Sequence, residues 1–460
     1  MRRHAALLVL AAVAACGPVS SPIPSAISTP ATSASAAPSA LAPSSSPLPS
    51  PNSSPSAIAG AIREVRADLG RLNPGDIGGP ADQAVVRADA AFGLRLYHEL
   101  VKGGGNLIFS PYSISTALSM AYAGARGTSA TQLAAALGVG DDPIAWHQGR
   151  NDIDAALTRS ATYETPDGST PLAIEPTNAL FGQDGFPFEP DYLELLARAY
   201  GAGLQALDFA TDPEAGRQAI NAWVANRTKQ RIPELLAAGK VTSSTRFVLV
   251  NAIFFKASWA APFQKKLTKA APFHRLDGTT VSTPLMHGSI DGNYIRGTDW
   301  QAVEVPYLGA TMTVVLPDAG RFAAVEKRLD GGILDELAAH PKYRTIHLAL
   351  PRWSSSTSAD LNGMLVRLGI RDVFDAENAD LTGIADAGLY ISFVVHQANI
   401  DVDEAGTEAA AATAVGGDTS GGGPEGEVTV TVDRPFIFLI RDATSGEILF
   451  AGRVVDPSSR

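Results

Sequence analysis

The chain has 460 residues, of which 45% are apolar, and its 36 Lys and Arg residues are outnumbered by 47 Asp and Glu residues. This length accommodates one large domain or two modest ones with a substantial hydrophobic core. Because the balance is acidic and no basic block interrupts it, the composition argues against nucleic acid or another polyanion as a partner.

The first residues have the pattern of an export signal. Two arginines precede an apolar run from Ala5 to Ala15, which is too short to span a bilayer. The run ends in Val13-Ala14-Ala15-Cys16, which resembles the lipobox of bacterial lipoproteins. That resemblance implies that residues 1–15 are a signal peptide and that the Cys16 sulfur carries a diacylglyceryl group. An ordinary signal peptide with an incidental cysteine is the alternative interpretation.

Cys16 is the only cysteine in the chain. The folded part therefore has no internal disulfide, no cysteine-based zinc site and no cysteine nucleophile. We expect the protein to be exported and lipid-anchored to a bacterial cell envelope, outside the cytoplasm, with membrane contact only through lipidated Cys16. Secretion without an anchor is the alternative location.

The segment 16–60 is dominated by Ser, Pro and Ala, and no charged residue occurs from Gly17 to Ile62. Such a composition cannot bury a core and predicts a disordered tether with a reach of about 40–100 Å. An O-glycosylated stalk is an alternative that would still act as a spacer. We expect residues 61–81 to form a linker or short pre-domain segment, and residues 82–460 to form the folded domain.

The beginning of this domain has the pattern of helix, strand and helix. Apolar spacing predicts a helix from Ala84 to Val101, which three glycines end. Ile108 and Phe109 suit a short strand. Ser110-Pro111 marks a helix start, because proline is favoured in the first turn, and Ser113–Ala123 suits a buried helix.

The later part of the domain is richer in strands. Ile220–Leu236 is amphipathic and predicts another helix, whereas Phe247–Trp259 is a β-prone apolar run typical of a strand buried on both faces. Further strand-like runs are TMTVVLP, TIHLALP and EVTVTVDRPFIFLI. Helices come mostly early and strands mostly late, which predicts an α+β fold with large sheets.

The sequence lacks the common catalytic signatures. It contains no G-x-S-x-G elbow, no H-E-x-x-H motif, no P-loop and no G-x-G-x-x-G fingerprint. His287–Gly292 (HGSIDG) brings His, Ser and Asp together, but neighbours on one loop rarely align for proton relay, so we interpret this stretch as a turn. The His residues show no metal-ligand spacing. An enzyme remains possible on these grounds, but no motif names its chemistry, and we expect no cofactor and no metal.

One stretch just before the C-terminal strands is unusual for a globular domain. DEAGTEAAAATAVGGDTSGGGPEG, Asp403–Gly426, is acidic at its start, then rich in alanine and finally rich in glycine. An Ala-rich helix over Glu404–Val415 is one interpretation, although an isolated helix of this length is marginal and has no apolar stripe to dock it. An exposed loop of small residues is the other.

Four separated segments resemble the serpin family. They are NLIFSPYSISTALSMAYAGARGTSATQL, INAWVANRTKQRI with LVNAIFFKASWAAPF, VHQANIDVDEAGTEAAAAT, and VTVDRPFIFLI. They occur in the family's order, and the resemblance covers about residues 82–458. It implies a serpin fold, with helices, large mostly antiparallel β-sheets and an exposed, insertable reactive loop at about residues 404–433.

By this resemblance, the protein is an irreversible suicide inhibitor of serine proteases. The protease attacks the loop and forms an acyl-enzyme, and the cut loop then inserts into the sheet and distorts the protease. The expected partner is thus a serine protease in a covalent complex with a monomeric inhibitor. Some serpins bind heparin through a segment that corresponds to residues 141–161, but here Asp outnumbers Arg, so no heparin is expected. A non-inhibitory serpin-fold binding protein is the alternative.

The resemblance also assigns the hinge of the loop, where insertion starts. The hinge residues are Glu404, Gly406, Thr407, Glu408, Ala409, Ala410, Ala411, Ala412 and Thr413. Side chains alternate between the two faces of a strand. On insertion, Thr407, Ala409 and Ala411 should therefore face the core, whereas Glu408 and Ala410 should face water. Small side chains at the core positions favour insertion, and hence inhibition.

Two structural sites follow from the same resemblance. The shutter, a buried polar cluster where the sheet opens, is expected at Ser110, Ser113, Asn251 and His396. The breach, where insertion begins, is expected at Trp259. The plain alternatives are a serine helix cap, a strand asparagine, a lone buried histidine and an ordinary core tryptophan. In either interpretation these residues are structural, and none is catalytic.

The family's spacing from Gly406 places the scissile bond between Ser420 and Gly421, with Asp418 and Thr419 as alternative positions. Between Glu404 and Asp433 there is no Lys, Arg, Leu, Met or aromatic residue, which argues against trypsin-like and chymotrypsin-like targets. A small residue at the cut suits an elastase-like or subtilisin-like protease. A cut after an acidic residue would instead suit an acid-specific protease.

Overall fold

Two large β-sheets and the helices around them form the domain in the computed structural model, which describes residues 62–161, 172–339, 341–407 and 424–459. The predicted α+β fold is confirmed. The expected signal peptide, the tether and most of the expected reactive loop lie outside the described residues.

The first sheet carries the region into which a loop would insert. Its seven strands lie in the spatial order β1 (Arg63–Val65), β4 (Leu204–Leu207), β3 (Leu172–Gln183), β5 (Phe247–Ser258), β13 (Gly406–Thr407), β12 (Ile391–Val402) and β11 (Trp353–Asp360). β5 also pairs directly with β12, in parallel, over most of its length. The two-residue strand β13 separates them only at one end.

The second sheet lies against the end of the first sheet at which β13 separates β5 from β12. Its main path runs β14 (Glu427–Thr431), β10 (Lys342–Pro351), β7 (Thr280–Gly297), β8 (Trp300–Pro306), β9 (Ala310–Pro317), β15 (Phe436–Asp442), β16 (Ile448–Val454) and β2 (Leu107–Phe109), and β6 (Lys269–His274) pairs with β7. β14, the edge strand, begins a few residues after the undescribed part of the loop. The loop therefore joins the inserted strand of one sheet to the edge of the other.

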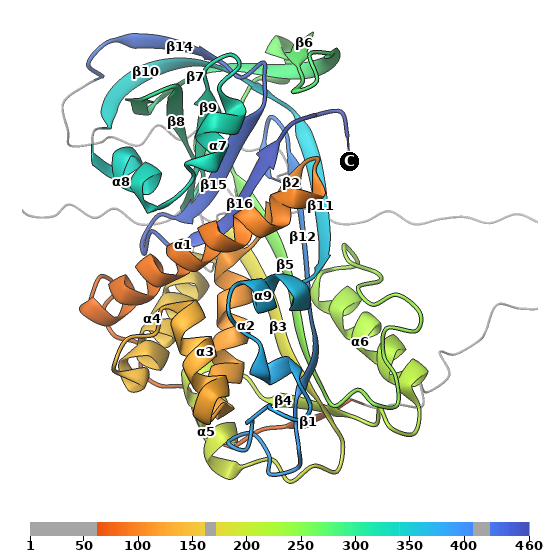
Figure 1. The fold of residues 1–460 in the computed structure, drawn as a ribbon. Coiled ribbons are helices and arrows are strands. Elements are labelled where there is room, and N and C mark those ends of the chain that lie inside the picture. The colour runs from red at the N-terminus through yellow and green to blue at the C-terminus, as the bar shows by residue number, and fades with distance from the viewer. Residues whose placement is uncertain (1–61, 162–171, 340, 408–423, 460) are drawn as a thin grey trace, which may run out of the picture. The chain divides into compact units, whose positions relative to one another are not determined.

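The helices surround the first sheet and one end of the second (Figure 1). They are α1 (Pro80–Leu100), α2 (Pro111–Gly124), α3 (Gly127–Leu137), α4 (Pro143–Ala161), α5 (Pro190–Tyr200), α6 (Pro213–Arg227), α7 (Phe322–Lys327), α8 (Gly331–Ala339) and α9 (Asn362–Arg367), with 3₁₀ turns at Val101–Gly103, Lys265–Leu267 and Asp372–Phe374. α2 packs against β3 and β5, and α6 lies on the other face of these strands.

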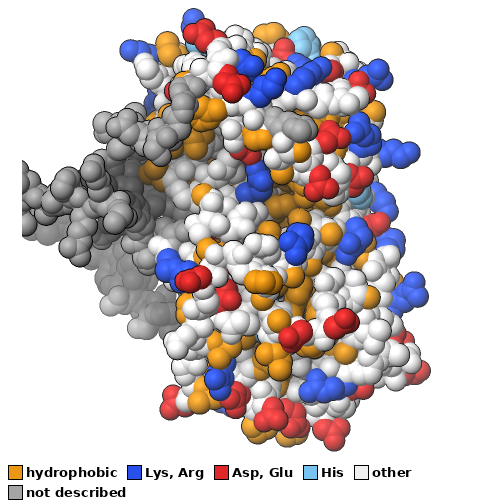
Figure 2. Space-filling model, turned by 90° about the vertical axis from the view of Figure 1, so that its left-hand side faces the viewer, with side chains coloured by type: hydrophobic (Ala, Val, Ile, Leu, Met, Phe, Trp, Pro, Cys, Tyr) orange, Lys and Arg blue, Asp and Glu red, His pale blue; other side chains and the backbone are white. Residues whose placement is uncertain are grey.

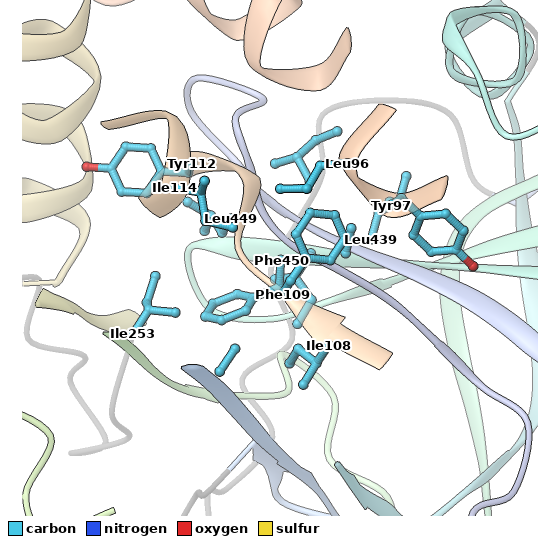
Figure 3. Packing of buried hydrophobic residues seen from close by; sticks show 14 of the residues in the cluster. Leu96, Tyr97, Ile108, Phe109, Tyr112, Ile114, Ile253, Leu439, Leu449 and Phe450 are labelled. Carbon is cyan, nitrogen blue, oxygen red and sulfur yellow. The ribbon is translucent and has the colours of Figure 1, made fainter. Parts of the chain in front are cut away.

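β5 is buried on both faces, as its continuous apolar sequence predicts. Leu249 and Ile253 join the main core with α1 and α2, whereas Val248 and Val250 pack with α6. Figure 3 shows the main core, where Phe109 of β2 lies close to Phe450 of β16. Since successive side chains of a strand point to opposite faces, a single β5 sequence serves two cores.

The predicted helix Ile220–Leu236 is wrong at both ends. The helix α6 spans Pro213–Arg227, and Lys229 and Gln230 then adopt positive φ angles of 51° and 64°, which end it. The following chain folds back, because the Asn221 side chain binds the backbone of Leu236 through both its oxygen and its nitrogen.

The interpretation of His287–Gly292 as a turn is also wrong. The whole stretch lies inside β7 and pairs with β10 over Ile346–Ala349 and beyond. His287, Ser289 and Asp291 alternate with more buried residues and share the open face of the strand. Its polar appearance comes from that one solvated face.

Part of the segment 61–81, expected as a linker or short pre-domain segment, belongs to the body of the fold. β1 pairs antiparallel with β4 and adds an edge strand to the first sheet. Further along, the Leu72 backbone donates a hydrogen bond to the carbonyl oxygen of Arg198 in α5. The sequence signal was weak because the strand has only three residues.

Candidate functional site

The candidate site is the place where β13 enters the first sheet. Thr407 lies opposite Ala257 of β5 and Val402 of β12, and Gly406 lies opposite Ser258. Gly406 has a φ of 144°, and a Cβ atom there would lie 2.2 Å from the Ala257 carbonyl oxygen. This entry point therefore requires glycine.

Thr407 is already seated in the sheet. Its side chain is fully buried, and its hydroxyl group lies 2.8 Å from the hydroxyl group of Tyr307. The sequence predicted that Thr407 would face the core on insertion, and in this structure its side chain does face the core. Glu408–Thr413 of the expected hinge, and Asp418–Gly421 around the expected scissile bond, lie outside the described residues.

Trp259, the expected breach residue, sits at the same entry point. Its ring stacks on Tyr307 with a centroid distance of 3.9 Å and an interplanar angle of 10°. Its indole nitrogen donates a hydrogen bond of 2.9 Å to the Asp403 carbonyl oxygen, and its backbone nitrogen donates to that of Ala405. Trp259 thus holds the chain segment that leads into β13.

Glu404 is held by charge and hydrogen bonds although its side chain is only 1% exposed. Arg352 donates to both carboxylate oxygens, at 2.6 and 2.7 Å, and the Thr268 hydroxyl donates at 2.6 Å. Burial raises the pKa of Glu404, but the hydrogen bonds from Thr268 and Arg352 outweigh it and hold the pKa below its usual value. The carboxylate is therefore a charged anchor for the start of the hinge.

The structure brings the four expected shutter residues into one buried network. His396 of β12 lies opposite Asn251 of β5 and hydrogen-bonds to its side-chain oxygen. The Asn251 amide nitrogen donates to the Ser113 hydroxyl at 2.6 Å, and the Ser110 backbone nitrogen donates to His396 Nε2 at 3.2 Å. The Ser110 hydroxyl caps α2 by accepting from the Ser113 backbone nitrogen.

The network fixes the protonation of His396. Because Nε2 accepts a hydrogen bond, Nδ1 carries the proton and donates it to Asn251. Burial lowers the pKa of His396 to about 3, so the ring is neutral at physiological pH. The cluster lies where β5 and β12 pair directly, on the path that an extended β13 would follow between them.

Three residues that contribute to this region were not predicted from the sequence. Asn178 of β3 accepts hydrogen bonds from Ser113 and Asn251 and completes the shutter. Arg352 holds Glu404, and Tyr307 holds Thr407. Asn178 lies opposite Asn251 in the sheet. Only the register of β3 against β5 reveals this pairing.

Other kinds of site are not found in the described part of the chain. No group of three or more His, Cys, Asp or Glu side chains there is placed to hold a metal ion. No helix among the described residues is long and apolar enough to cross a membrane.

The chain belongs to the serpin (serine protease inhibitor) family, whose sequence model matches residues 87–457. Both the fold and the buried hinge entry fit this assignment. Serpins are inhibitors of proteases rather than enzymes, although some do not inhibit.

Individual relatives agree with the family. The chain is 37% identical to a leukocyte elastase inhibitor of Bos taurus over 387 residues, which cover 80% of this chain and 98% of that protein. It is similar to the structure of tengpin, a thermophilic serpin, in the native state, with 25% identity and a TM-score of 0.73 over 86% of this chain and 100% of the other. It is also similar to human thyroxine-binding globulin in complex with its hormone, with 27% identity and a TM-score of 0.72 over 82% and 100% of the two chains.

Proposed function

We propose that the protein is an irreversible suicide inhibitor of serine proteases that prefer small residues, and that it traps the acyl-enzyme by inserting its reactive loop. The observation that carries this proposal is the position of Gly406 and Thr407, already between β5 and β12. The residues that follow in sequence, Ala409–Ala412, are small enough to continue the same strand.

The reaction starts when the serine hydroxyl of the protease attacks the carbonyl carbon of the scissile bond. The bond from Ser420 to Gly421 breaks, the Gly421 amine leaves with a proton, and Ser420 becomes an ester on the protease. β13 then lengthens between β5 and β12, which separates Asn251 from His396. The protease is carried along and distorted before water hydrolyses the ester.

The target class rests on the composition of the loop. Ser420 is small, as are its neighbours, and the alternatives Asp418 and Thr419 contribute no large or basic side chain. An elastase-like or subtilisin-like enzyme accepts such residues. The similarity to leukocyte elastase inhibitors supports the same choice.

We further propose that the inhibitor acts outside the cytoplasm of a bacterium, as a monomer tethered by lipidated Cys16. The apolar run that ends at Cys16 supports this location. The Ser/Pro/Ala-rich segment 16–60 would set the distance between the membrane and the inhibitory domain. Mass spectrometry of the membrane fraction would detect the diacylglyceryl group on an N-terminal cysteine. An intact, unmodified N-terminus in the culture medium would contradict it.

The second candidate is a non-inhibitory binding protein. The similarity to thyroxine-binding globulin, which was solved with a bound hormone, is the observation that favours it. The buried Thr407 and the small residues after it favour inhibition instead.

The test is denaturing mass spectrometry of the chain without its signal peptide, mixed with pancreatic elastase. The proposal predicts a covalent species whose mass equals protease plus inhibitor minus the released C-terminal peptide, and the mass of that peptide identifies the cut. If elastase, subtilisin and a Glu-specific protease all leave only nicked inhibitor and active enzyme, the non-inhibitory candidate is favoured.

A further inference from the structure

A groove lies far from the hinge, between α4, α5 and the segment that precedes α1. It has a volume of about 350 Å³, and its apolar lining includes Leu72, Ile144, Leu195 and Ala199. α5 lies at the end of the domain opposite β14 and β10 (Figure 1). An occupant of this groove would therefore leave the reactive-loop end free for a protease.

One wall of the groove lies outside the region that the family model matches and is firmly attached to the domain. Leu72 precedes the region that the serpin family matches, residues 87–457. Arg71 donates a hydrogen bond of 2.7 Å to Asn151 of α4, and the Gly75 backbone nitrogen donates one of 2.8 Å to Asp152. Together with the bond from Leu72 to α5, these contacts build a preformed groove, which reduces the entropic penalty of binding.

Ile144 stands at the edge of this groove with 82% of its surface exposed. It is the second residue of α4, directly after Pro143, and the Asp142 carboxylate caps the helix by accepting from the Ile144 backbone nitrogen. Removing a side chain of this size from water favours association. Isolated exposed apolar residues are common, but this one adjoins an apolar concavity, so a ligand that fills the groove would bury it as well.

The charge around the groove is negative. Asp191 and Glu194 of α5 line it, and Asp141 and Asp142 shortly precede Ile144 in the chain. The lining cation, Arg198, is paired with Glu194, so Asp191 carries the unbalanced charge of the lining. Figure 2 shows the face that carries α4 and α5, where hydrophobic side chains in the lower half lie among Asp and Glu side chains and also among Lys and Arg side chains.

The remaining titratable group of the lining, His147, adds no positive charge at neutral pH. It hydrogen-bonds to the Tyr200 hydroxyl group, and burial lowers its pKa to about 4. An apolar groove with an acidic rim fits a ligand that combines apolar anchors with cations.

We propose that this groove binds a basic amphipathic segment of a partner protein. Apolar side chains of the segment pack on Ile144, Leu72 and Leu195, and its Lys or Arg residues pair with the carboxylates of α5 and of the α4 cap. A second copy of this chain is a poorer occupant, since the chain carries a net charge of −11. The inference does not depend on whether the reactive loop inhibits a protease.

The experiment uses a synthetic amphipathic helix of Leu and Lys as the probe, with fluorescence anisotropy against the chain without its signal peptide at 0.15 M salt. Ile144→Ser removes the apolar anchor without changing charge, and Asp191→Asn removes one carboxylate. Leu276→Ser is the matched control, because Leu276 is also apolar and 56% exposed but lies after β6, away from the groove.

We expect Ile144→Ser to weaken binding at least tenfold, Asp191→Asn to weaken it severalfold, and Leu276→Ser to have no effect. A Leu/Glu peptide should not bind. Equal binding to the wild-type protein and Ile144→Ser, or an equal loss in Leu276→Ser, would overturn the proposal. Analytical ultracentrifugation that shows a dimer broken by Ile144→Ser would overturn it in favour of self-association.

Discussion

The hydroxyl group of Thr407 lies 2.8 Å from that of Tyr307, and both side chains are buried. Thr407 comes from β13, and Tyr307 follows β8 of the second sheet. This hydrogen bond therefore ties the inserted start of the hinge to the neighbouring sheet, while β5 and β12 still pair directly beyond it. The loop is seated at the point from which further insertion would proceed.

A charge on a core-facing residue of the hinge should stop insertion. Thr407→Arg would bury an unpaired cation beside Tyr307, and burial of that charge would destabilise the inserted form by several kcal/mol. We expect the protease to cut the loop and escape, so that the stoichiometry of inhibition rises at least severalfold. The stoichiometry of inhibition is measured by titrating a fixed amount of protease with inhibitor and following the residual protease activity.

A matched pair further along the hinge tests the alternation directly. Ala411→Glu should behave like Thr407→Arg, because residue 411 is expected to face the core. Ala410→Glu adds the same charge on the side expected to face water and should inhibit normally. Full inhibition by both core-facing variants would refute the insertion model.

Glu404 should stabilise the domain in a pH-dependent way. Its pKa is lowered relative to an ordinary value of 4.5, so its contribution is complete above about pH 4.5 and is lost as the pH falls through the lower value of the folded state. Glu404→Gln should lower the free energy of unfolding by about 1–3 kcal/mol at pH 7. Chemical denaturation at pH 7 and pH 3 measures the difference, which should shrink at pH 3.

The control for Glu404 is Glu336→Gln. Glu336 forms an exposed ion pair with Arg328, at 3.5 Å, and such pairs contribute little. If both variants lose the same stability, or if the loss in Glu404→Gln is constant with pH, the ion pair between the buried Glu404 carboxylate and the half-exposed Arg352 is not the cause.

His396→Ala should loosen the shutter. The variant leaves the Ser110 backbone nitrogen and the Asn251 side chain without their partner, which costs about 1–3 kcal/mol. We expect premature loop insertion or polymers on mild heating, seen by native gel electrophoresis. His347→Ala, at a half-exposed histidine of β10, should stay monomeric under the same conditions.

The wild-type shutter should also weaken in acid. The pKa of His396 is about 3 in the folded state against an ordinary value of 6.5. Its stabilising contribution is therefore complete above about pH 6.5 and falls as the pH drops toward 3. A His396→Ala variant whose polymerisation and pH profile match the wild type would show that the histidine is an ordinary core residue.

Glu447 offers a stabilising substitution. It lies between β15 and β16, is fully buried, and neither carboxylate oxygen has a hydrogen-bond donor among the described residues. Burial, followed by the charge of Asp89, raises the pKa of Glu447 well above 4.5. Its contribution to stability is therefore complete below pH 4.5 and is lost as the pH rises.

Glu447→Gln should raise the free energy of unfolding at pH 8 by about 1–3 kcal/mol, because the amide is already neutral and can donate a hydrogen bond without first binding a proton. At pH 4 the two proteins should be nearly equal. Parallel stability curves from pH 4 to 8 would contradict a buried, protonated Glu447.

Structural features that a short stretch of sequence determines were predicted, whereas features without a local sequence pattern were not. The apolar run of β5 and the Ser110-Pro111 helix start are local patterns, and both were predicted. The end of α6 was not, because non-glycine residues at Lys229 and Gln230 adopt positive φ. Such conformations are rare enough that no sequence rule anticipates them.

The candidate site also contains some residues that the sequence predicted and others that it did not. Gly406 and Thr407 were expected at the hinge through the resemblance, but their present burial between β5 and β12 depends on tertiary pairing. Arg352 and Tyr307 meet the hinge from more than fifty residues away in the chain. Their contacts arise from strand order and register, which a single sequence does not encode in any local pattern.

The central claim is that the cut loop becomes a strand of the first sheet. The most direct measurement is thermal unfolding before and after a single nick in the loop, made by a non-target protease and verified by mass. A loop that inserts between β5 and β12 adds backbone hydrogen bonds and buried surface, so the nicked protein should unfold at a clearly higher temperature than the intact one. An unchanged or lower unfolding temperature after nicking would show that the loop stays outside the sheet and would contradict the inhibitory mechanism.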